Sequence, residues 1–326
     1  MNAETEQVFS IKSSEEFREA ALSVFNYQVS NCPVYKEFVK GLRIDPWSVN
    51  EITQIPFLPV EFFKTQDIIT ENNKPEIVFS SSGTTGMTQS RHLVADVSIY
   101  EKSFRKGFKY FYGDIRSYTI LALLPSYQER EGSSLIYMVD DLIEKSENQK
   151  SGYFLYNHDD LFQTLLTLKT EKKPTILIGV TYALLDFIEN FRIDFLELIV
   201  METGGMKGKR TEMIREELHN ILCAGFGVNA IHSEYGMTEL LSQAYSKGKG
   251  IFECPPWMQV LVRDINDPFT FLLEGKTGGI NIIDLANINS CSFIATQDLG
   301  KCTGKTFEIS GRFDNSDIRG CNLLVQ

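Results

Sequence analysis

The 326-residue sequence has few histidines and tryptophans, four and two respectively, and its six cysteines form no paired motif. No two cysteines have CxxC spacing, and none clusters with histidine, which disfavours a zinc centre and a disulfide framework. A glycine-rich stretch is present, but no Gly-Lys-Ser/Thr follows it, so it is not a Walker A loop.

Long hydrophobic runs and an excess of positive charge are also missing. No apolar run approaches the ~18 residues that a transmembrane helix needs, and residues 1–14 are polar, without the apolar segment of a signal peptide. The net charge of -11 disfavours nucleic acid and anionic membranes as general partners. We therefore expect a cytoplasmic protein without membrane insertion. ATP is not excluded, because a local constellation of residues binds phosphate whatever the net charge.

The part of the chain up to residue 250 alternates short apolar segments with helical patterns. Apolar spacing predicts two helices between residues 14 and 39, broken at Cys32-Pro33. Further helices are predicted at 98–111, 132–143, 161–168, 182–191 and 211–222, and strands at 119–124, 175–180 and 196–200. This alternation favours an α/β fold with a largely parallel, helix-covered sheet.

Beyond residue 250 the pattern changes to short strands separated by turn residues. We expect these strands at 260–262, 269–273, 279–283, 292–294 and 306–309. They predict a small antiparallel sheet or barrel. We therefore divide the chain into an α/β core, residues 1–250, and a small β subdomain, residues 251–326, which ends in a tail that carries Cys321.

A polar loop follows the apolar triplet Ile77-Val78-Phe79, which predicts a buried strand. The loop residues are Ser80, Ser81, Ser82, Gly83, Thr84, Thr85 and Gly86. Glycines let a backbone approach a phosphate, and the hydroxyls add neutral donors, so this loop is suited to bind an anion. Taken alone, a flexible turn is equally compatible with this composition.

Two more polar junctions follow apolar segments. One is Thr203-Gly204-Gly205-Met206-Lys207, and the other runs from Ser233 to Glu239 as Ser-Glu-Tyr-Gly-Met-Thr-Glu. Ligands of open parallel sheets bind beyond the carboxyl ends of the strands, where all three junctions should lie. Alone, the glycine pair is a plain turn and Glu239 a solvated carboxylate. Together they offer donors, a flat glycine surface and a carboxylate able to hold Mg²⁺ beside phosphates.

Four motifs occur in the order found in acyl-adenylate-forming enzymes, which the chain resembles. They are Ser81-Ser82-Gly83-Thr84-Thr85-Gly86, Tyr235-Gly236-Met237-Thr238-Glu239, Thr296-Gln297-Asp298 and Gly311-Arg312-Phe313-Asp314. The resemblance implies that ATP and Mg²⁺ are used. It implies that the ATP phosphates bind to the first motif, Ser81, Ser82, Gly83, Thr84, Thr85 and Gly86, and that adenine lies against Gly204, Gly205, Tyr235 and Gly236. It further implies that Thr238 and Glu239 contact phosphate and Mg²⁺. The ribose would be held by Asp298 and Arg312.

Two features depart from that superfamily. The Pro-Lys that commonly follows the first loop is replaced by residues 87–91, so Arg91 would have to supply any nearby positive charge. The sequence also ends at Gln326, without the mobile C-terminal domain and its catalytic lysine. The second departure disfavours ordinary acyl-CoA ligase chemistry.

A narrower resemblance fits the short length: the chain is similar to the acyl-protein synthetases of bacterial luminescence operons, the LuxE type. The similar segments are residues 55–64, the loop with Gly83, Thr203-Gly204-Gly205, Pro255-Pro256-Trp257 and Gly320-Cys321. That family activates a fatty acid as acyl-AMP, transfers the acyl group to its own cysteine near the C-terminus, and passes it to a reductase partner. By position, Cys321 matches that cysteine.

A thiol at Cys321 would attack an acyl-adenylate as the thiolate, and Arg319 or Arg312 could raise the ionised fraction. The alternative is an incidental thiol near a chain end. Three functions therefore stay open: a self-acylating acyl-protein synthetase, a ligase that passes acyl-AMP to CoA or a carrier-protein thiol, and a non-catalytic nucleotide-binding subunit.

Overall fold

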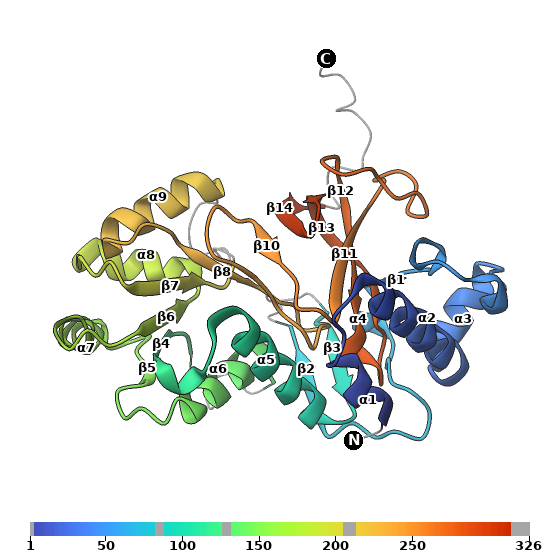
Figure 1. The fold of residues 1–326 in the computed structure, drawn as a ribbon, viewed down its shortest axis with the longest axis horizontal. Helices are drawn as coiled ribbons and strands as arrows, with labels where there is room; N and C mark the ends of the chain where they lie inside the picture. Colours follow the sequence, from blue (N-terminus) through green and yellow to red (C-terminus); the bar gives the residue numbers. More distant parts are fainter. Residues whose placement is uncertain (1–2, 82–87, 126–131, 205–212, 314–326) are drawn as a thin grey trace, which may run out of the picture.

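The computed structural model describes residues 3–81, 88–125, 132–204 and 213–313 (Figure 1). Its parallel strands are β4 (Thr119–Leu123), β6 (Thr175–Gly179), β7 (Leu198–Glu202) and β8 (His232–Tyr235), with the short β5 (Gly152–Tyr153) beside β4. Every residue of β4 and β6 is buried, as expected for strands covered on both faces.

Helices cover both faces of this parallel part. In Figure 1, α5 (Val97–Tyr112) and α6 (Ser134–Lys145) lie below the strands, and α8 (Thr181–Asn190) and α9 (Arg215–Phe226) lie above them; α7 (His158–Thr170) lies at the β5 end. The Asp96 side chain caps α5 by accepting from the Ser98 N–H. Gly227 ends α9 with a φ of 65°, a left-handed backbone conformation that glycine adopts without a Cβ clash.

The antiparallel strands continue the same sheet. They are β9 (Ala244–Ser246), β10 (Phe252–Glu253), β11 (Met258–Arg263), β12 (Thr277–Asp284), β13 (Phe293–Thr303) and β14 (Thr306–Arg312). Over the described residues the strand order is β11-β12-β13-β14-β10-β9-β8-β7-β6-β4-β5. The hairpin between β13 and β14 aligns Asp298 with Arg312. A second, two-stranded antiparallel sheet contains β2 (Ile77–Ser80) and β3 (Arg91–Val94).

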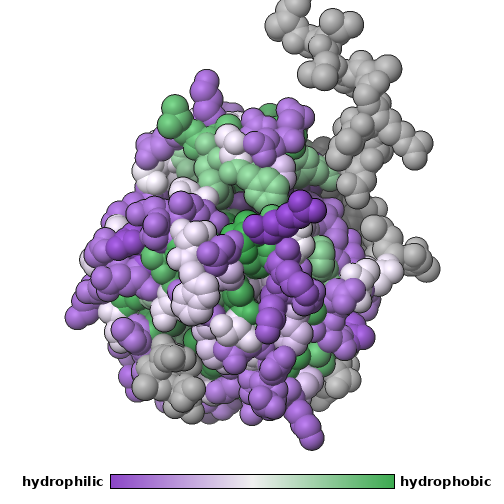
Figure 2. Space-filling view, turned by 90° about the vertical axis from the view of Figure 1, so that its right-hand side faces the viewer, coloured by the Kyte–Doolittle hydropathy of each residue, from purple (hydrophilic) through white to green (hydrophobic). Residues whose placement is uncertain are grey.

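The N-terminal segment packs against the late strands. It contains α1 (Ala3–Val8), α2 (Ser14–Asn31), α3 (Pro33–Gly41), β1 (Leu58–Pro59) and α4 (Phe62–Thr65). β1 pairs in parallel with β13, and the buried Gln28 amide of α2 donates to the backbone oxygens of Asn287 and Ile288. Figure 2 shows the face toward this side of Figure 1, where polar side chains predominate and apolar ones gather in its middle and upper parts.

Four short 3-10 helices complete the described elements. They are η1 (Pro46–Ser48), η2 (Ile52–Gln54), η3 (Ile115–Ser117) and η4 (Leu285–Asn287). No helix within the described ranges is long and apolar enough to cross a bilayer.

The α/β fold with a helix-covered parallel sheet and antiparallel late strands is confirmed, whereas two local predictions are wrong. Residues 269–273 form only an isolated antiparallel bridge, between Phe271 and Arg263 of β11, and not a strand; Asp264 and Asp267 accept hydrogen bonds from following backbone N–H groups in the turns before it. The strand before the first loop is not fully buried, because Val78 is 40% exposed on a two-stranded sheet. The division of the chain at residue 250 stays a prediction.

Candidate active site

Three predicted nucleotide-binding side chains meet where β8, β13 and β14 lie together. The Tyr235 hydroxyl donates to Asp298 Oδ2 at 2.7 Å, and Arg312 Nε lies 3.1 Å from Asp298 Oδ1. Asp298 is buried, whereas the Arg312 side chain is 67% exposed. The carboxylate is therefore held from two sides, and the guanidinium keeps donors free to reach a ligand.

The Thr238-Glu239 segment follows β8 and is fixed through its backbone. The His92 ring nitrogen Nδ1 lies 2.9 Å from the Thr238 carbonyl oxygen, and Asn287 Nδ2 donates to the Glu239 carbonyl oxygen at 2.7 Å. Because that oxygen is an acceptor, Nδ1 carries the ring proton. Burial lowers the pKa of His92 to about 4, so the ring is neutral at pH 7. His92 belongs to β3, so this bond connects the hairpin of the first loop to the Tyr235–Glu239 motif.

Glu239 is the candidate metal ligand, and its surroundings fit that role. Burial raises the pKa of its carboxyl, while the Ser90 hydroxyl and the charges of Arg312 and Lys64 act in the opposite direction. A buried carboxylate is stabilised by a cation, and Mg²⁺ in nucleotide sites is held by one or two carboxylates plus phosphates. Among the described residues, no group of three or more His, Cys, Asp or Glu side chains could hold a metal. The role of Glu239 as a ligand of a nucleotide-bound cation stays a prediction.

The first loop is described only at its two ends. Ser81 N–H donates to the Ser90 carbonyl oxygen at 3.1 Å, and the Ser90 N–H donates to Ser81 Oγ at 2.9 Å. Ser80 N–H donates to the Gly132 carbonyl oxygen at 2.8 Å. These bonds close the base of the loop and leave the Ser81 hydroxyl proton available. Ser82, Gly83, Thr84, Thr85 and Gly86 lie outside the described residues.

Gly204 begins the second junction with a φ of 69°, and its N–H donates to Glu202 Oε2 at 2.8 Å. The buried Glu202 carboxylate also accepts from Thr181 and faces Arg215 at 3.4 Å. Although burial opposes ionisation, the bond to His219 and the Arg215 charge outweigh it, so the pKa of Glu202 is lowered. Gly205 lies outside the described residues.

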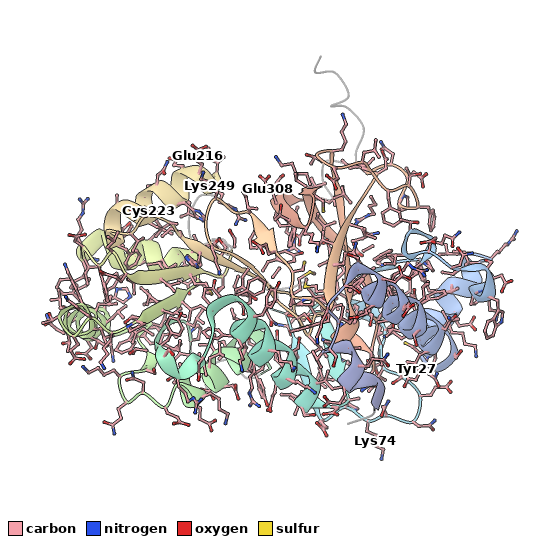
Figure 3. All side chains as sticks on the ribbon, in the orientation of Figure 1. Tyr27, Lys74, Glu216, Cys223, Lys249 and Glu308 are labelled. Atoms are coloured by element: carbon pink, nitrogen blue, oxygen red, sulfur yellow. The ribbon has the colours of Figure 1, made fainter. Side chains whose placement is uncertain are left out.

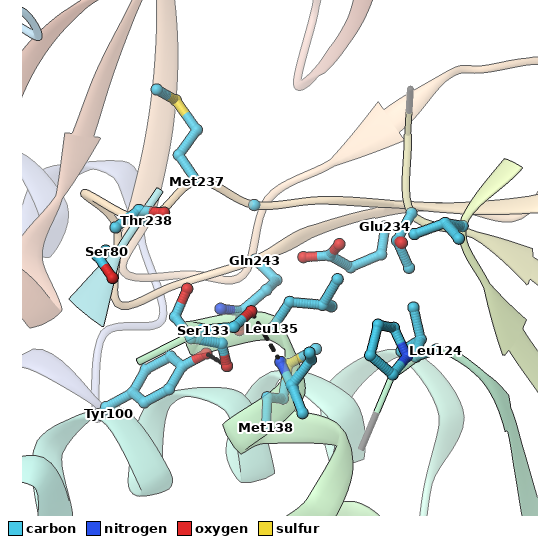
Figure 4. A pocket seen from close by; sticks show the side chains of 16 residues that line it. Ser80, Tyr100, Leu124, Ser133, Leu135, Met138, Glu234, Met237, Thr238 and Gln243 are labelled. Carbon is cyan, nitrogen blue, oxygen red and sulfur yellow. Dashed lines mark hydrogen bonds between the residues drawn. The ribbon is translucent and has the colours of Figure 1, made fainter. Parts of the chain in front are cut away.

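A cavity of about 170 Å³ lies beneath the Tyr235–Glu239 motif (Figure 4). Thr238 and Gly236 line its upper side, and residues of α6 line the opposite side. The described lining residues are Ser80, Tyr100, Leu124, Pro125, Ser133, Ser134, Leu135, Ile136, Met138, Val180, Thr203, Glu234, Gly236, Met237, Thr238 and Gln243. Figure 4 shows the Glu234 carboxyl pointing into this space. The cavity adjoins the predicted nucleotide residues and has room for a small substrate.

Sequence reasoning missed four residues of this region: Glu234, Gln243, His92 and Ser90. Glu234 precedes Tyr235 on β8, and strand alternation directs it to the opposite face, which was a usable signal. The contacts of Ser90 and His92 depend on tertiary packing. The ring nitrogen Nδ1 of His232, the first residue of β8, lies 3.1 Å from the Tyr112 hydroxyl, and His232 is not among the described residues that line the cavity.

The chain ends its described part at Phe313, so Cys321 lies outside it. Burial raises the pKa of each of the five described cysteines, Cys32, Cys223, Cys254, Cys291 and Cys302, and each is a free thiol.

The fold is similar to solved adenylate-forming enzymes. ATP-bound MatB from Rhodopseudomonas palustris matches 72% of this chain and 47% of its own, with a TM-score of 0.53 and 17% identity. A 2-hydroxyisobutyryl-CoA ligase in complex with 2-HIB-AMP and CoA matches 94% of this chain and 77% of its own, with a TM-score of 0.65 and 11% identity. At these identities the likeness concerns the fold.

Sequence comparison is more specific. The long-chain-fatty-acid–luciferin-component ligase of Photorhabdus luminescens is 31% identical over 71 residues, which are 22% of this chain and 60% of that protein. The match thus spans less than two thirds of that relative. The family model described as "Acyl-protein synthetase, LuxE" matches residues 6–326, nearly the whole chain. The chain therefore belongs to the LuxE family of acyl-protein synthetases.

Proposed function

We propose that this protein uses ATP to convert a carboxylic acid into acyl-AMP and then takes the acyl group onto Cys321 as a thioester. The observation that carries the proposal is the junction of Tyr235, Asp298 and Arg312, three residues from separate motifs, beside the cavity beneath Thr238. The family model, which extends through Cys321, supports the second step.

In the first step, a carboxylate oxygen attacks the α-phosphorus of ATP and pyrophosphate leaves. Arg312 and Asp298 hold the ribose, Tyr235, Gly236, Gly204 and Gly205 contact adenine, and the loop from Ser81 to Gly86 donates to the phosphates. Glu239 would hold Mg²⁺, which would neutralise phosphate charge when bound, and Thr238 would donate its hydroxyl to phosphate. Catalysis in this step is positioning and charge stabilisation.

In the second step, the Cys321 thiolate attacks the acyl carbonyl carbon, a C–S bond forms, and AMP leaves. The described cysteines suit this step poorly, because burial raises the pKa of all five and keeps them as thiols near pH 7. A partner protein, such as an acyl reductase or an acyl carrier, then accepts the acyl group.

The test is intact-protein mass spectrometry after incubation with ATP, Mg²⁺ and a panel of carboxylic acids. Wild type is compared with Cys321→Ser and with the matched control Cys223→Ser, which removes a half-buried thiol from α9 (Figure 3). We expect an ATP-dependent, hydroxylamine-labile acyl adduct on wild type and the control, and none on Cys321→Ser. An equal adduct on Cys321→Ser would refute the acceptor role.

A second candidate is a ligase that passes acyl-AMP to CoA or to a carrier-protein thiol. It is favoured by the similarity in fold to a ligase whose solved complex contains CoA. In that case AMP release accelerates when CoA or a carrier thiol is added, and Cys321→Ser retains wild-type turnover. ATP binding without pyrophosphate exchange for any acid would instead favour a non-catalytic nucleotide-binding subunit.

A further inference from the structure

The ladder between the parallel strands β7 and β8 ends next to the predicted adenine site. The last residues that the two strands pair are Glu202 and Ser233, whereas β8 continues to Tyr235 along its other neighbour, β9. Gly204 and Tyr235, which are predicted to contact adenine from two sides, each follow this last pair by two positions. The two walls of the base site are therefore the chain segments that leave the end of one ladder.

Paired strands are too close together for a base to lie between them. Neighbouring strands are about 4.8 Å apart. A flat ring in contact with a wall on each side needs those walls roughly 7 Å apart, which is twice the contact distance of ~3.5 Å between carbon atoms. A base can therefore lie between Gly204 and Tyr235 only if the chain segments diverge after their last pair. The contacts that hold this pair and both walls set the width of the base site.

The guanidinium of Arg215 lies at this last pair and reaches both strands. Its Nη1 lies 3.4 Å from Glu202 Oε1 and donates to Ser233 Oγ at 3.5 Å. Arg215 is the first residue of α9, which lies above the sheet in Figure 1. The Glu202 side chain is only 5% exposed, so the carboxylate half of this ion pair is protected from solvent. One side chain thus connects the helix to both strands where their ladder ends.

Each wall of the predicted base site is connected to Arg215 through one intermediate residue. The Gly204 N–H donates to Oε2 of the same Glu202 carboxylate at 2.8 Å, which holds the left-handed turn at Gly204. On the other side, the Arg215 guanidinium lies 5.2 Å from the centroid of the Phe252 ring, a favourable cation–π contact. The Phe252 ring packs edge-on against Tyr235, with ring centroids 5.9 Å apart.

We infer that Arg215 is a positioning residue of the nucleotide site, which holds the ends of β7 and β8 at the separation that a purine base needs between Gly204 and Tyr235. The inference rests on the proposed function for the identity of the nucleotide. It adds to that function the residue that sets how tightly the base binds. Arg215 acts through Glu202 and Phe252 and leaves the chemical step to other residues.

The test is calorimetry in the presence of Mg²⁺ with two probes, ATP and inorganic triphosphate, which has three linked phosphates but no base. For Arg215→Met we expect the Kd for ATP to rise by roughly 10-fold or more, the effect of losing one stacked base. The Kd for triphosphate should stay within roughly 2-fold of the wild-type value. An unchanged Kd for ATP would overturn the inference. Equal rises for both probes would make Arg215 a phosphate-binding residue and would also overturn it.

Pyrophosphate exchange with a panel of carboxylic acids separates base binding from chemistry. In Arg215→Met the KM for ATP should rise by roughly 10-fold, while kcat and the KM for the acid stay within roughly 3-fold, because uniform binding has been lost. A fall in kcat with an unchanged KM for ATP would overturn the inference and leave the proposed function intact. If no acid supports exchange in wild type, but Arg215→Met selectively weakens ATP binding, the inference stands and the proposed function fails.

Two further variants separate positioning from folding and from charge. Removal of Arg215 alone leaves the Glu202 carboxylate buried without this partner, which can destabilise the fold. The double variant Arg215→Met with Glu202→Gln also removes that charge and should keep the raised Kd for ATP; a wild-type Kd in this folded variant would overturn the inference. Arg215→Lys keeps a positive charge but not the planar fork, so it should recover only part of the ATP affinity. Full recovery would show that charge alone matters and would refute positioning.

The matched control is Arg18→Met on α2. Arg18 forms an ion pair with Glu15 at 2.8 Å, and its side chain is 34% exposed, against 33% for Arg215. The control should leave the Kd values for ATP and for triphosphate unchanged. A rise in its Kd for ATP as large as that of Arg215→Met would reveal a general effect of arginine removal and would overturn the inference.

Discussion

Replacing Glu234 by glutamine should stabilise the folded protein, and the gain should grow with pH. The glutamine side chain has nearly the same shape but does not ionise. In the folded protein, burial and the Glu202 carboxylate raise the pKa of Glu234 to about 8, whereas its unperturbed value is 4.5. Because the folded pKa is the higher one, wild type loses stability as pH rises from about 4.5 to about 8.

The size of the effect follows from these two values. Each pH unit between them costs wild type about 1.4 kcal/mol, so the free-energy difference between Glu234→Gln and wild type should widen by about 3 kcal/mol from pH 5 to pH 8. Water that enters the cavity from solvent reduces this figure.

Urea unfolding followed by fluorescence at pH 5, 6, 7 and 8 measures this difference directly. Glu308→Gln serves as the control: it removes a surface ion pair with Lys301 at 3.1 Å and should change stability by no more than about 1 kcal/mol. If the difference in unfolding free energy between Glu234→Gln and wild type were the same at all four pH values, the pKa of Glu234 would not be raised in the folded protein, and the argument would be refuted.

Three further outcomes are expected. Tyr235→Phe removes the hydroxyl that donates to Asp298 at 2.7 Å. In urea unfolding it should destabilise the protein by about 1.5–3 kcal/mol, and in calorimetry it should raise the Kd for ATP. An unchanged unfolding free energy and Kd would contradict a functional role of this contact. Gly236→Ala places a Cβ against the flexible end of the Glu234 side chain, so the unfolding free energy should fall by about 1 kcal/mol, the low end of an overpacking cost. A loss well above this value in urea unfolding would show that the Glu234 side chain cannot move aside. Burial lowers the pKa of His92 to about 4 in the folded protein, from 6.5 in the unfolded chain. As the pH falls from 6.5 to 4, the unfolding free energy of wild type should therefore decrease by about 3 kcal/mol more than that of His92→Gln. Urea midpoints that fall in parallel for the two proteins would exclude His92 as the source of this pH dependence.

The regular elements of the parallel sheet were predictable because burial on both faces selects continuous apolar runs. The strands β4 and β6 are such runs, and the helices between them show apolar positions at helical spacing. The segment at 269–273 is also apolar, but it contacts β11 through a single bridge, between Phe271 and Arg263, after the turns formed at Asp264 and Asp267. Composition alone does not distinguish these two outcomes.

The site was predictable only in part. Tyr235 and Asp298 are 63 residues apart, and their hydrogen bond depends on how β8, β13 and β14 are arranged in the sheet. Sequence spacing does not predict this contact; both residues were assigned to the nucleotide site from the resemblance to adenylate-forming enzymes. Glu234 lies in the third polar junction, where strand alternation could have placed it opposite Tyr235, whereas Gln243 lies outside the motifs and lines the cavity only through tertiary packing. The roles of the loop residues and of Cys321 stay predictions.

The pairing of β1 with β13 has a consequence for the order in which the chain can fold. Leu58 of β1 cannot pair with β13 until Ile294 has been synthesised, and Gln28 of α2 cannot form its hydrogen bond until Asn287 has been synthesised. The partners of these N-terminal residues are therefore synthesised late. Such contacts have a high loop-closure cost and form slowly. On the ribosome, the apolar face of α2 would stay exposed while more than two hundred residues are added, a window in which chaperones would be expected to bind the nascent N-terminal helices.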